Sequence, residues 1–328
     1  MPTLLITQDR EKIHPDQIQE IKELAHGYDL WFTPDPKADP ERLATVEISA
    51  GFLPQRELIL TPGLKWHHAF SAGVDWLFTY DDYENLPMIL TNSCGIHGAC
   101  MSEHAFAMIL AFERGFVKFI NNQNNNYWEP FGRGGKIGVI AGKTMLILGV
   151  GAIGERVARL AKAHDMHVLG MRRQPDKSYE YVDEMFGQDD LESLLPRADY
   201  IVSILPNTPD TRHILGANQF ELMKNEAFIV NIGRGVHINE AALVDALNAG
   251  QVRGAGLDTF ETEPLPEDSP LWNFDQVIIS PHCAGFRPDY SFEARKLFIE
   301  NLKHFLAGEK MVNVVDKRLG YSTAGRGA

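Results

Sequence analysis

Three closely spaced glycines stand where a chain could bind a phosphate group through its own backbone. Gly149, Gly151 and Gly154 follow the apolar run 144–148 and precede a helical stretch over 155–164. The first glycine would permit a tight turn, the second would let the backbone approach a pyrophosphate, and the third would let helix and strand pack closely. A helix N-terminus also attracts anions. We therefore expect a bound dinucleotide, held by Gly149, Gly151, Ala152, Ile153 and Gly154.

The end of the second strand after this motif indicates which dinucleotide is bound. An NAD site has an Asp or Glu there, about 20 residues after the motif begins, to accept hydrogen bonds from the ribose 2′-hydroxyl. This sequence has Arg172 and Arg173 instead. Two guanidinium groups would bind a 2′-phosphate through charge-assisted hydrogen bonds. The pattern predicts a preference for NADP; NAD remains possible if the arginines are instead solvated surface charges.

Polar residues also stand in three segments whose surroundings are apolar or glycine-rich. The segments are 231–235, 257–266 and 280–285, and they carry Arg234, Asp258, Glu263 and His282. Each segment comes just after a predicted strand. Ligands of an open parallel sheet bind at the carboxyl ends of its strands, so we expect all three segments to converge on the cofactor.

In this order, and with the glycine motif ahead of them, these segments resemble the D-isomer-specific 2-hydroxyacid dehydrogenase family, including its glyoxylate/hydroxypyruvate reductases. The resemblance covers nearly the whole chain. It extends to the stretches 71–75, 102–105, 205–211 and 313–316. It implies an NAD(P)-dependent oxidoreductase that converts a small 2-keto acid to the D-2-hydroxy acid and back, with Arg234, Glu263 and His282 as the catalytic set.

Elementary chemistry supports that catalytic set. Reduction of a 2-keto acid requires a cation for the carboxylate and carbonyl oxygens, a hydride donor, and an acid that protonates the developing alkoxide. Arg234 would supply the cation and His282 the acid. Glu263, bonded to the imidazole, would fix its tautomer and favour its protonated form. In the oxidative direction the neutral imidazole of His282 would be the base.

The resemblance implies further contacts with substrate and cofactor. Backbone N–H groups of Ala72 and Gly73 would bind the substrate carboxylate, and Asp258 would hydrogen-bond the nicotinamide amide. The remaining expected cofactor contacts are Leu205, Pro206, Thr211, Ile232, Gly233 and Gly285. We expect no metal site, because no Cys or acidic residue stands at the usual ligand spacing from His67, His68, His97 or His104.

Two other functions share this fold. Formate dehydrogenase-like hydride transfer needs no proton relay, and such enzymes replace the carboxylate beside the histidine with an amide, so Glu263 argues against it. A regulatory protein that senses nicotinamide could retain the catalytic set. Turnover of any 2-keto acid would distinguish an enzyme from such a sensor.

The positioning elements are strands that alternate with amphipathic helices, a pattern typical of an α/β fold. We expect two Rossmann-like domains. A discontinuous, flavodoxin-like catalytic domain would comprise 1–100 and 284–328, and a cofactor domain with a doubly wound parallel sheet would comprise 101–283. The active site would lie in the cleft between them.

The individual elements follow from the apolar pattern. The first domain should contain a helix over 15–26, and the second should begin with one long helix over about 101–121. Strands are expected at 4–7, 46–49, 64–70, 144–148, 167–171, 200–205, 228–232, 254–258 and 277–280, and a final helix at 289–306.

Composition limits the partners. The net charge of −13 gives no general attraction for nucleic acid or an anionic membrane. The apolar stretch 105–112 is far shorter than the roughly 20 residues that span a bilayer. With three cysteines and no signal-peptide pattern, we expect a cytoplasmic protein with reduced thiols. The long irregular segment 121–142 indicates an arm that joins two copies in a homodimer.

Overall fold

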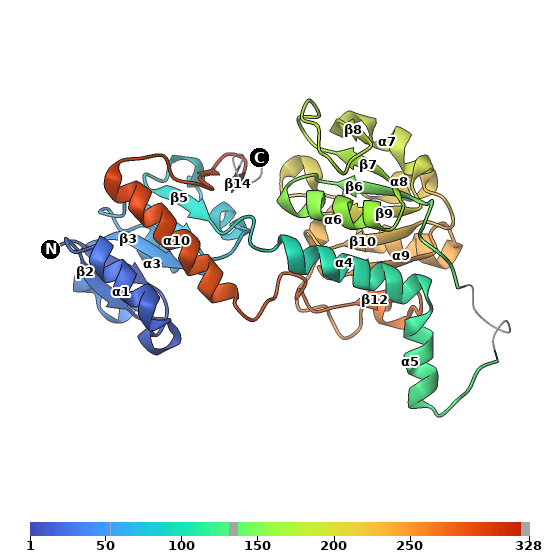
Figure 1. The fold of residues 1–328 in the computed structure, drawn as a ribbon, viewed down its shortest axis with the longest axis horizontal. Helices are drawn as coiled ribbons and strands as arrows, with labels where there is room; N and C mark the ends of the chain where they lie inside the picture. The colour runs from blue at the N-terminus through green and yellow to red at the C-terminus, as the bar shows by residue number, and fades with distance from the viewer. Residues whose placement is uncertain (53, 131–136, 323–328) are drawn as a thin grey trace. The chain divides into compact units, whose positions relative to one another are not determined.

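The computed structural model describes residues 1–52, 54–130 and 137–322. The chain divides into two compact units (Figure 1). The first unit comprises Met1–His97 and Arg287–Ala328, and the second is Gly98–Phe286. The first unit is therefore discontinuous in sequence, because its last segment returns only after the second unit is complete.

The first unit contains a five-stranded parallel sheet in the order β2-β1-β3-β4-β5. Its strands are β1 (Thr3–Ile6), β2 (Asp29–Phe32), β3 (Val46–Gly51), β4 (Trp66–Ala69) and β5 (Ile89–Asn92). This is the flavodoxin-like strand order, and it confirms the expected fold class. Two of its strands, β2 and β5, were not predicted.

Helices cover both faces of this sheet. Apolar side chains of α1 (Pro15–Leu24) and α10 (Tyr290–Ala307) pack on one face, where Trp66 stacks on Phe298 with ring centroids 5.2 Å apart. The short helices α2 (Pro40–Leu43) and α3 (Arg56–Ile59) cover the other. Close to the C-terminus, β13 (Val315–Asp316) pairs antiparallel with β14 (Tyr321–Ser322).

The second unit contains a seven-stranded sheet, parallel throughout, in the order β12-β11-β10-β9-β6-β7-β8. Its strands are β6 (Thr144–Leu148), β7 (His167–Met171), β8 (Glu184–Phe186), β9 (Tyr200–Ser203), β10 (Phe228–Asn231), β11 (Gly254–Leu257) and β12 (Val277–Ile279). The strand order reverses between β6 and β9, which is the topological switch point of a dinucleotide-binding fold. The six predicted strands are present, and β8 is an additional one at the edge.

Two apolar layers make this sheet doubly wound, as expected. Side chains of α4 (Gly98–Glu113) and α6 (Ala152–Ala163) pack on one face. Those of α7 (Leu191–Leu194), α8 (Ala217–Leu222) and α9 (Glu240–Ala249) pack on the other. The central strand β6, Thr-Met-Leu-Ile-Leu, is buried from Met145 to Leu148, as a strand covered on both faces must be.

The prediction of one continuous helix over 101–121 is wrong. The chain leaves the helix at Gly115, which has a left-handed φ of +70°, and a second helix, α5 (Phe116–Asn124), begins there. Apolar residues continue at helical spacing across the break, which is why the pattern did not reveal it. After the break they are exposed, with Phe116 at 55% and Ile120 at 57%.

The predicted arm 121–142 is partly described. After α5 ends, residues 125–130 and 137–142 contain neither helix nor strand. Lys118 Nζ lies 2.7 Å from Glu129 Oε1, and Gly138 N donates to Glu113 O at 2.9 Å. Residues 131–136 lie outside the described part. Within the described ranges, no helix is both long and apolar enough to cross a bilayer.

Candidate active site

The glycine motif forms the turn between β6 and α6. Gly149 has a left-handed φ of +103°, and a Cβ there would lie 2.8 Å from Ile204 O. A Cβ on Gly154 would lie 2.5 Å from Gly149 O, so close helix–strand packing requires glycine. Gly151 caps the twelve-residue helix α6, and a Cβ there would meet nothing within 4 Å. The open space at this helix N-terminus fits a pyrophosphate.

The two arginines follow β7 directly. The guanidinium of Arg172 lies over the ring of Tyr179, 5.5 Å from its centroid, and Nη1 donates a hydrogen bond to the tyrosine hydroxyl. Arg173 is exposed at the next position. No motif in the sequence indicated this role for Tyr179, which lies in an irregular segment between β7 and β8. Tyr179 orients one of the two charges expected to bind a 2′-phosphate.

The predicted contacts after β9 stabilise their own loop. Thr211 is buried, and its hydroxyl donates to Pro206 O at 2.7 Å and accepts from Thr208 N at 2.9 Å. Leu205 is also buried. Pro206 is half-buried, whereas the Thr211 side chain is fully used by the hydrogen bonds of the turn.

The segment that carries Arg234 is fixed by hydrogen bonds to its backbone. Asn231 Nδ2 donates to Arg234 O at 2.8 Å, and Arg234 N lies 3.3 Å from Nδ1 of the buried His237. Arg234 Nη1 donates to Gly233 O at 2.8 Å. Sequence reasoning singled out neither Asn231 nor His237 as a positioning residue. Ile232 is buried, so it can offer a ligand little but its backbone.

The Arg234 segment packs against the segment that carries Glu263. A Cβ on Gly235 would collide with the backbone of Phe260 and Glu261, so only glycine permits this approach. Asp258 N also donates to Asn231 O at 2.9 Å. The structure thus brings together the first two of the three expected segments.

Glu263 and His282 form a hydrogen-bonded pair. His282 Nδ1 lies 2.7 Å from Glu263 Oε2, and Nδ1 carries the proton because a carboxylate only accepts. The other carboxylate oxygen accepts from Phe260 N at 3.0 Å. Among the described residues nothing bonds to Nε2 of His282, whose side chain is 50% exposed. The geometry leaves Nε2 available to a ligand.

Asp258 anchors the loop on both sides of His282. Its carboxylate is 1% exposed and accepts from Ser280 Oγ at 2.5 Å, from Cys283 N at 2.9 Å and from Ala284 N at 2.9 Å. His282 itself has a left-handed φ of +51°, and its N–H donates to Asp258 O at 2.8 Å. The half-buried Gly285 follows in the same loop. With three donors bound, the carboxylate retains about one of its four acceptor sites.

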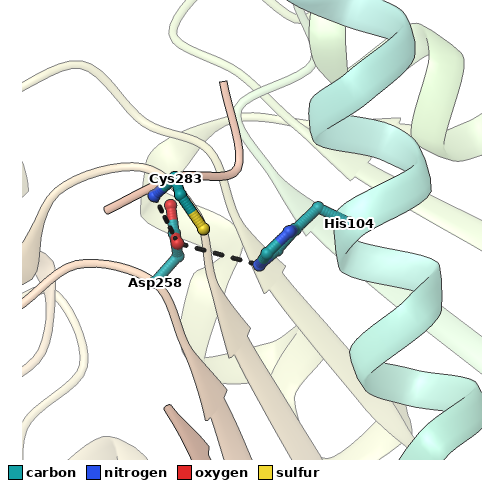
Figure 2. A group of neighbouring side chains, drawn as sticks. All are labelled: His104, Asp258 and Cys283. Carbon is teal, nitrogen blue, oxygen red and sulfur yellow. Dashed lines mark hydrogen bonds and ion pairs between the residues drawn. The ribbon is translucent and has the colours of Figure 1, made fainter. Parts of the chain in front are cut away.

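His104 of α4 approaches the same carboxylate. Its Nε2 lies 2.9 Å from Ser280 Oγ and 3.7 Å from Asp258 Oδ1, with the thiol of Cys283 beside them (Figure 2). The sequence-based argument against metal ligands considered only spacing along the chain, whereas folding brings an acidic residue and a cysteine to His104 from distant segments. His67 and His68, in contrast, are buried in the first unit.

The predicted substrate residues of the first unit lie in the turn after β4. Asn92 Nδ2 donates to Ala72 O at 2.6 Å, and Ser71 Oγ donates to Gly73 O at 2.6 Å. Both carbonyl groups are thereby fixed. Within the described part of the chain, the amide N–H groups of Ala72 and Gly73 have no acceptor.

Comparison with known proteins identifies the family. Residues 106–284 match the family model described as D-isomer specific 2-hydroxyacid dehydrogenase, NAD binding domain. The chain belongs to this family. As a D-isomer-specific 2-hydroxyacid dehydrogenase family member, it is an oxidoreductase that acts on a CH–OH group with a nicotinamide cofactor.

Solved structures of this family cover almost the whole chain. A family member from Aeromonas salmonicida subsp. salmonicida A449 is 31% identical with a TM-score of 0.83, covering 96% of this chain and 99% of its own. One from Xanthobacter autotrophicus Py2, in complex with NADPH and MES, is 28% identical with a TM-score of 0.80, covering 98% and 99%. An NADPH-dependent glyoxylate/hydroxypyruvate reductase from Sinorhizobium meliloti is 25% identical with a TM-score of 0.79, covering 98% and 100%.

Proposed function

We propose that this protein is an NADP-preferring D-2-hydroxyacid dehydrogenase, which reduces a small 2-keto acid to the D-2-hydroxy acid and catalyses the reverse reaction. The observation that carries the proposal is the 2.7 Å contact between His282 Nδ1 and Glu263 Oε2. A histidine held in this way has a defined tautomer and keeps Nε2 for proton transfer.

In the proposed reduction, His282 gives the proton on Nε2 to the alkoxide oxygen that develops from the substrate carbonyl. Glu263 stabilises the imidazolium from which the proton leaves, and the N–H of Phe260 prevents the carboxylate from turning away. In the oxidation, neutral His282 accepts the hydroxyl proton at the same atom.

Arg234 is the proposed ligand of the substrate carboxylate and carbonyl oxygens. Its guanidinium stays charged at any working pH and offers several donors in one plane. The amide N–H groups of Ala72 and Gly73 are proposed to bind the carboxylate as well. The role of these two amide groups is supported by the hydrogen bonds that fix the carbonyl groups of Ala72 and Gly73 in the same turn.

The cofactor supplies the hydride when it is bound. Its pyrophosphate would bind the backbone at Gly151 and the N-terminus of α6, and a 2′-phosphate would bind Arg172 and Arg173. The solved structures from Xanthobacter autotrophicus Py2 and Sinorhizobium meliloti contain NADPH and NADP, respectively, which supports this preference. Asp258 is proposed to use its remaining acceptor site for the nicotinamide amide.

Turnover with a panel of 2-keto acids tests the proposal. Glyoxylate, hydroxypyruvate, phenylpyruvate and branched 2-keto acids would be assayed with NADPH and NADH, and the chirality of the product determined. We expect D-2-hydroxy acid from at least one of them. NADPH binding without turnover of any member would instead favour the sensing function.

Variants of the His282–Glu263 pair test the mechanism. His282→Ala should lower kcat by about 10²–10⁴-fold, and Glu263→Gln, which keeps a hydrogen-bonding group but removes the charge, by about 10²-fold. NADPH affinity should be unchanged in both. His304→Ala provides the control, because His304 lies on α10 of the first unit and also pairs with a carboxylate. Its Nδ1 lies 2.9 Å from Glu309 Oε2. Equal effects of all three substitutions would refute the assigned roles.

A further inference from the structure

A thiol, an imidazole and a carboxylate meet beside the loop of His282. His104 comes from α4, Asp258 from the end of β11 and Cys283 from the loop after β12 (Figure 2). One donor atom from each side chain lies within 4.8 Å of the other two. We call these three residues the His104 cluster.

The spacing of the His104 cluster suits a small tetrahedral cation. Zn²⁺ bonds nitrogen and oxygen at about 2.0–2.1 Å and sulfur at about 2.3 Å, so its ligand atoms lie about 3.3–3.6 Å apart in a tetrahedron. His104 Nε2 and Asp258 Oδ1 are already 3.7 Å apart. Small side-chain rotations would complete three ligands, and water would take the fourth position.

The charge of Asp258 gives a second reason to expect a cation. The carboxylate is buried, and it accepts hydrogen bonds from one hydroxyl and two amide N–H groups, all of them neutral. Among the described residues, no lysine or arginine pairs with it, and the basic side chain beside it is His104, whose Nε2 lies 3.7 Å from Oδ1. Buried carboxylates in proteins are generally paired with a cation or coordinate a metal. The three neutral donors also fix the carboxylate in place, so a metal would find it preorganised.

Protonation of the cluster decides how a metal would enter. Burial, followed by the neighbouring Asp258 carboxylate, raises the pKa of the Cys283 thiol. A metal must therefore displace a proton from sulfur into solvent. His104 Nε2 lies 2.9 Å from Ser280 Oγ, and a metal would replace this contact.

We propose that the His104 cluster binds a zinc-class divalent cation through Cys283 Sγ, His104 Nε2 and a carboxylate oxygen of Asp258. Binding forms one metal–thiolate bond and releases one proton, and nothing is oxidised or reduced. Cys283 is adjacent to His282, and Asp258 is the proposed partner of the nicotinamide amide. A bound cation therefore inhibits the dehydrogenase. This inhibition rests on the proposed function, but the binding of the cation does not depend on it.

Titration with Co²⁺ tests binding without reference to activity. A cobalt–thiolate bond produces a charge-transfer absorption in the near ultraviolet, so the ligand sulfur is seen directly. We expect one equivalent to bind, with Zn²⁺ displacing it and about one proton released. Affinity should rise about tenfold per pH unit below the thiol pKa.

Substitutions identify the ligands. Cys283→Ser should abolish the charge-transfer band, and His104→Gln should weaken Co²⁺ binding about 100-fold. Cys100→Ser is the matched control, since Cys100 is a half-buried thiol on α4 that lies outside the cluster. Circular dichroism would verify that each variant is folded. A band that persists in Cys283→Ser, or no saturable binding in the folded wild type, would overturn the proposal.

A zinc inhibition assay separates this proposal from the proposed function. If the protein turns over 2-keto acids, Zn²⁺ should inhibit the wild type and a chelator should restore the rate. If it turns over none, the proposed function fails while the Co²⁺ titration still decides the metal site. Saturable Co²⁺ binding without any inhibition of an active enzyme would refute the inhibitory role alone.

Discussion

Two adjacent histidines in the first unit make its stability sensitive to acid. His67 and His68 lie on β4 and are fully buried. His67 Nδ1 lies 2.8 Å from Ser49 Oγ, and His68 Nδ1 lies 2.7 Å from Thr91 Oγ1. Burial lowers the pKa of each imidazole from 6.5 to about 3, with His67 contributing further to the shift at His68. Both rings are neutral in the folded protein.

The sign and size of the effect follow from linkage. Between pH 6.5 and about 3, the unfolded chain binds protons at these two rings and the folded chain does not. Their contribution to stability is therefore complete above pH 6.5 and is lost as the pH falls. At about pH 5, RT ln(1 + 10^1.5) is about 2 kcal/mol for each histidine. A loss of about 4 kcal/mol is a large part of the 5–15 kcal/mol that holds a typical domain folded.

Urea unfolding between about pH 4.5 and 7.5, followed by tryptophan fluorescence, measures this loss. His67→Asn and His68→Asn should each reduce the slope of unfolding free energy against pH by about 1.4 kcal/mol per pH unit near pH 5. Any pH-independent change in unfolding free energy caused by the substitution does not affect this comparison, because only the slopes against pH are compared. A substitution of the exposed His26 supplies the control. A wild-type slope in both buried variants would refute the reasoning.

Three other predictions concern the cofactor, the substrate and assembly. Neutral replacements of Arg172 and Arg173 should erode the NADPH preference mainly through cofactor KM, and an unaltered NADPH/NADH ratio of kcat/KM would contradict the 2′-phosphate site. Arg234→Ala should raise substrate KM and lower kcat while titrated NADPH affinity is retained. Because the apolar residues of α5 are exposed, we expect them to join two copies, and Ile120→Asp should convert a dimer to a monomer in analytical ultracentrifugation. A wild type that sediments as a monomer at every concentration would exclude that role of α5.

The fold class was predictable because the strands that fill the centre of each sheet are continuous apolar runs. β6 and β7 begin and end where the sequence placed them. The missed strands lie at sheet edges or contain few apolar residues. β8 is three half-buried residues that begin with Glu184, and in β2 only Trp31 is buried. Edge strands bury one side of a short segment, so the alternation of apolar and polar residues along them is too weak to detect.

The candidate site was predictable where its residues fall within one short motif. Gly149 has the left-handed turn and Gly154 the close packing that their spacing implied. Tyr179, Asn231 and His237 were missed because their roles depend on tertiary contacts rather than on spacing. His104 is the clearest case, since its partners lie far along the chain from it.

The discontinuity of the first unit has a consequence for biosynthesis. Strands β1–β5 leave the ribosome early, but α10, whose Phe298 stacks on Trp66, is made only after the entire second unit. At about 5–20 residues per second, this leaves one face of the first sheet with α1 but without α10 for on the order of ten seconds or more. The second unit is continuous and can complete its core during that interval. We therefore expect the N-terminal sheet to be the segment that most needs protection from aggregation in the cell, although it is synthesised first.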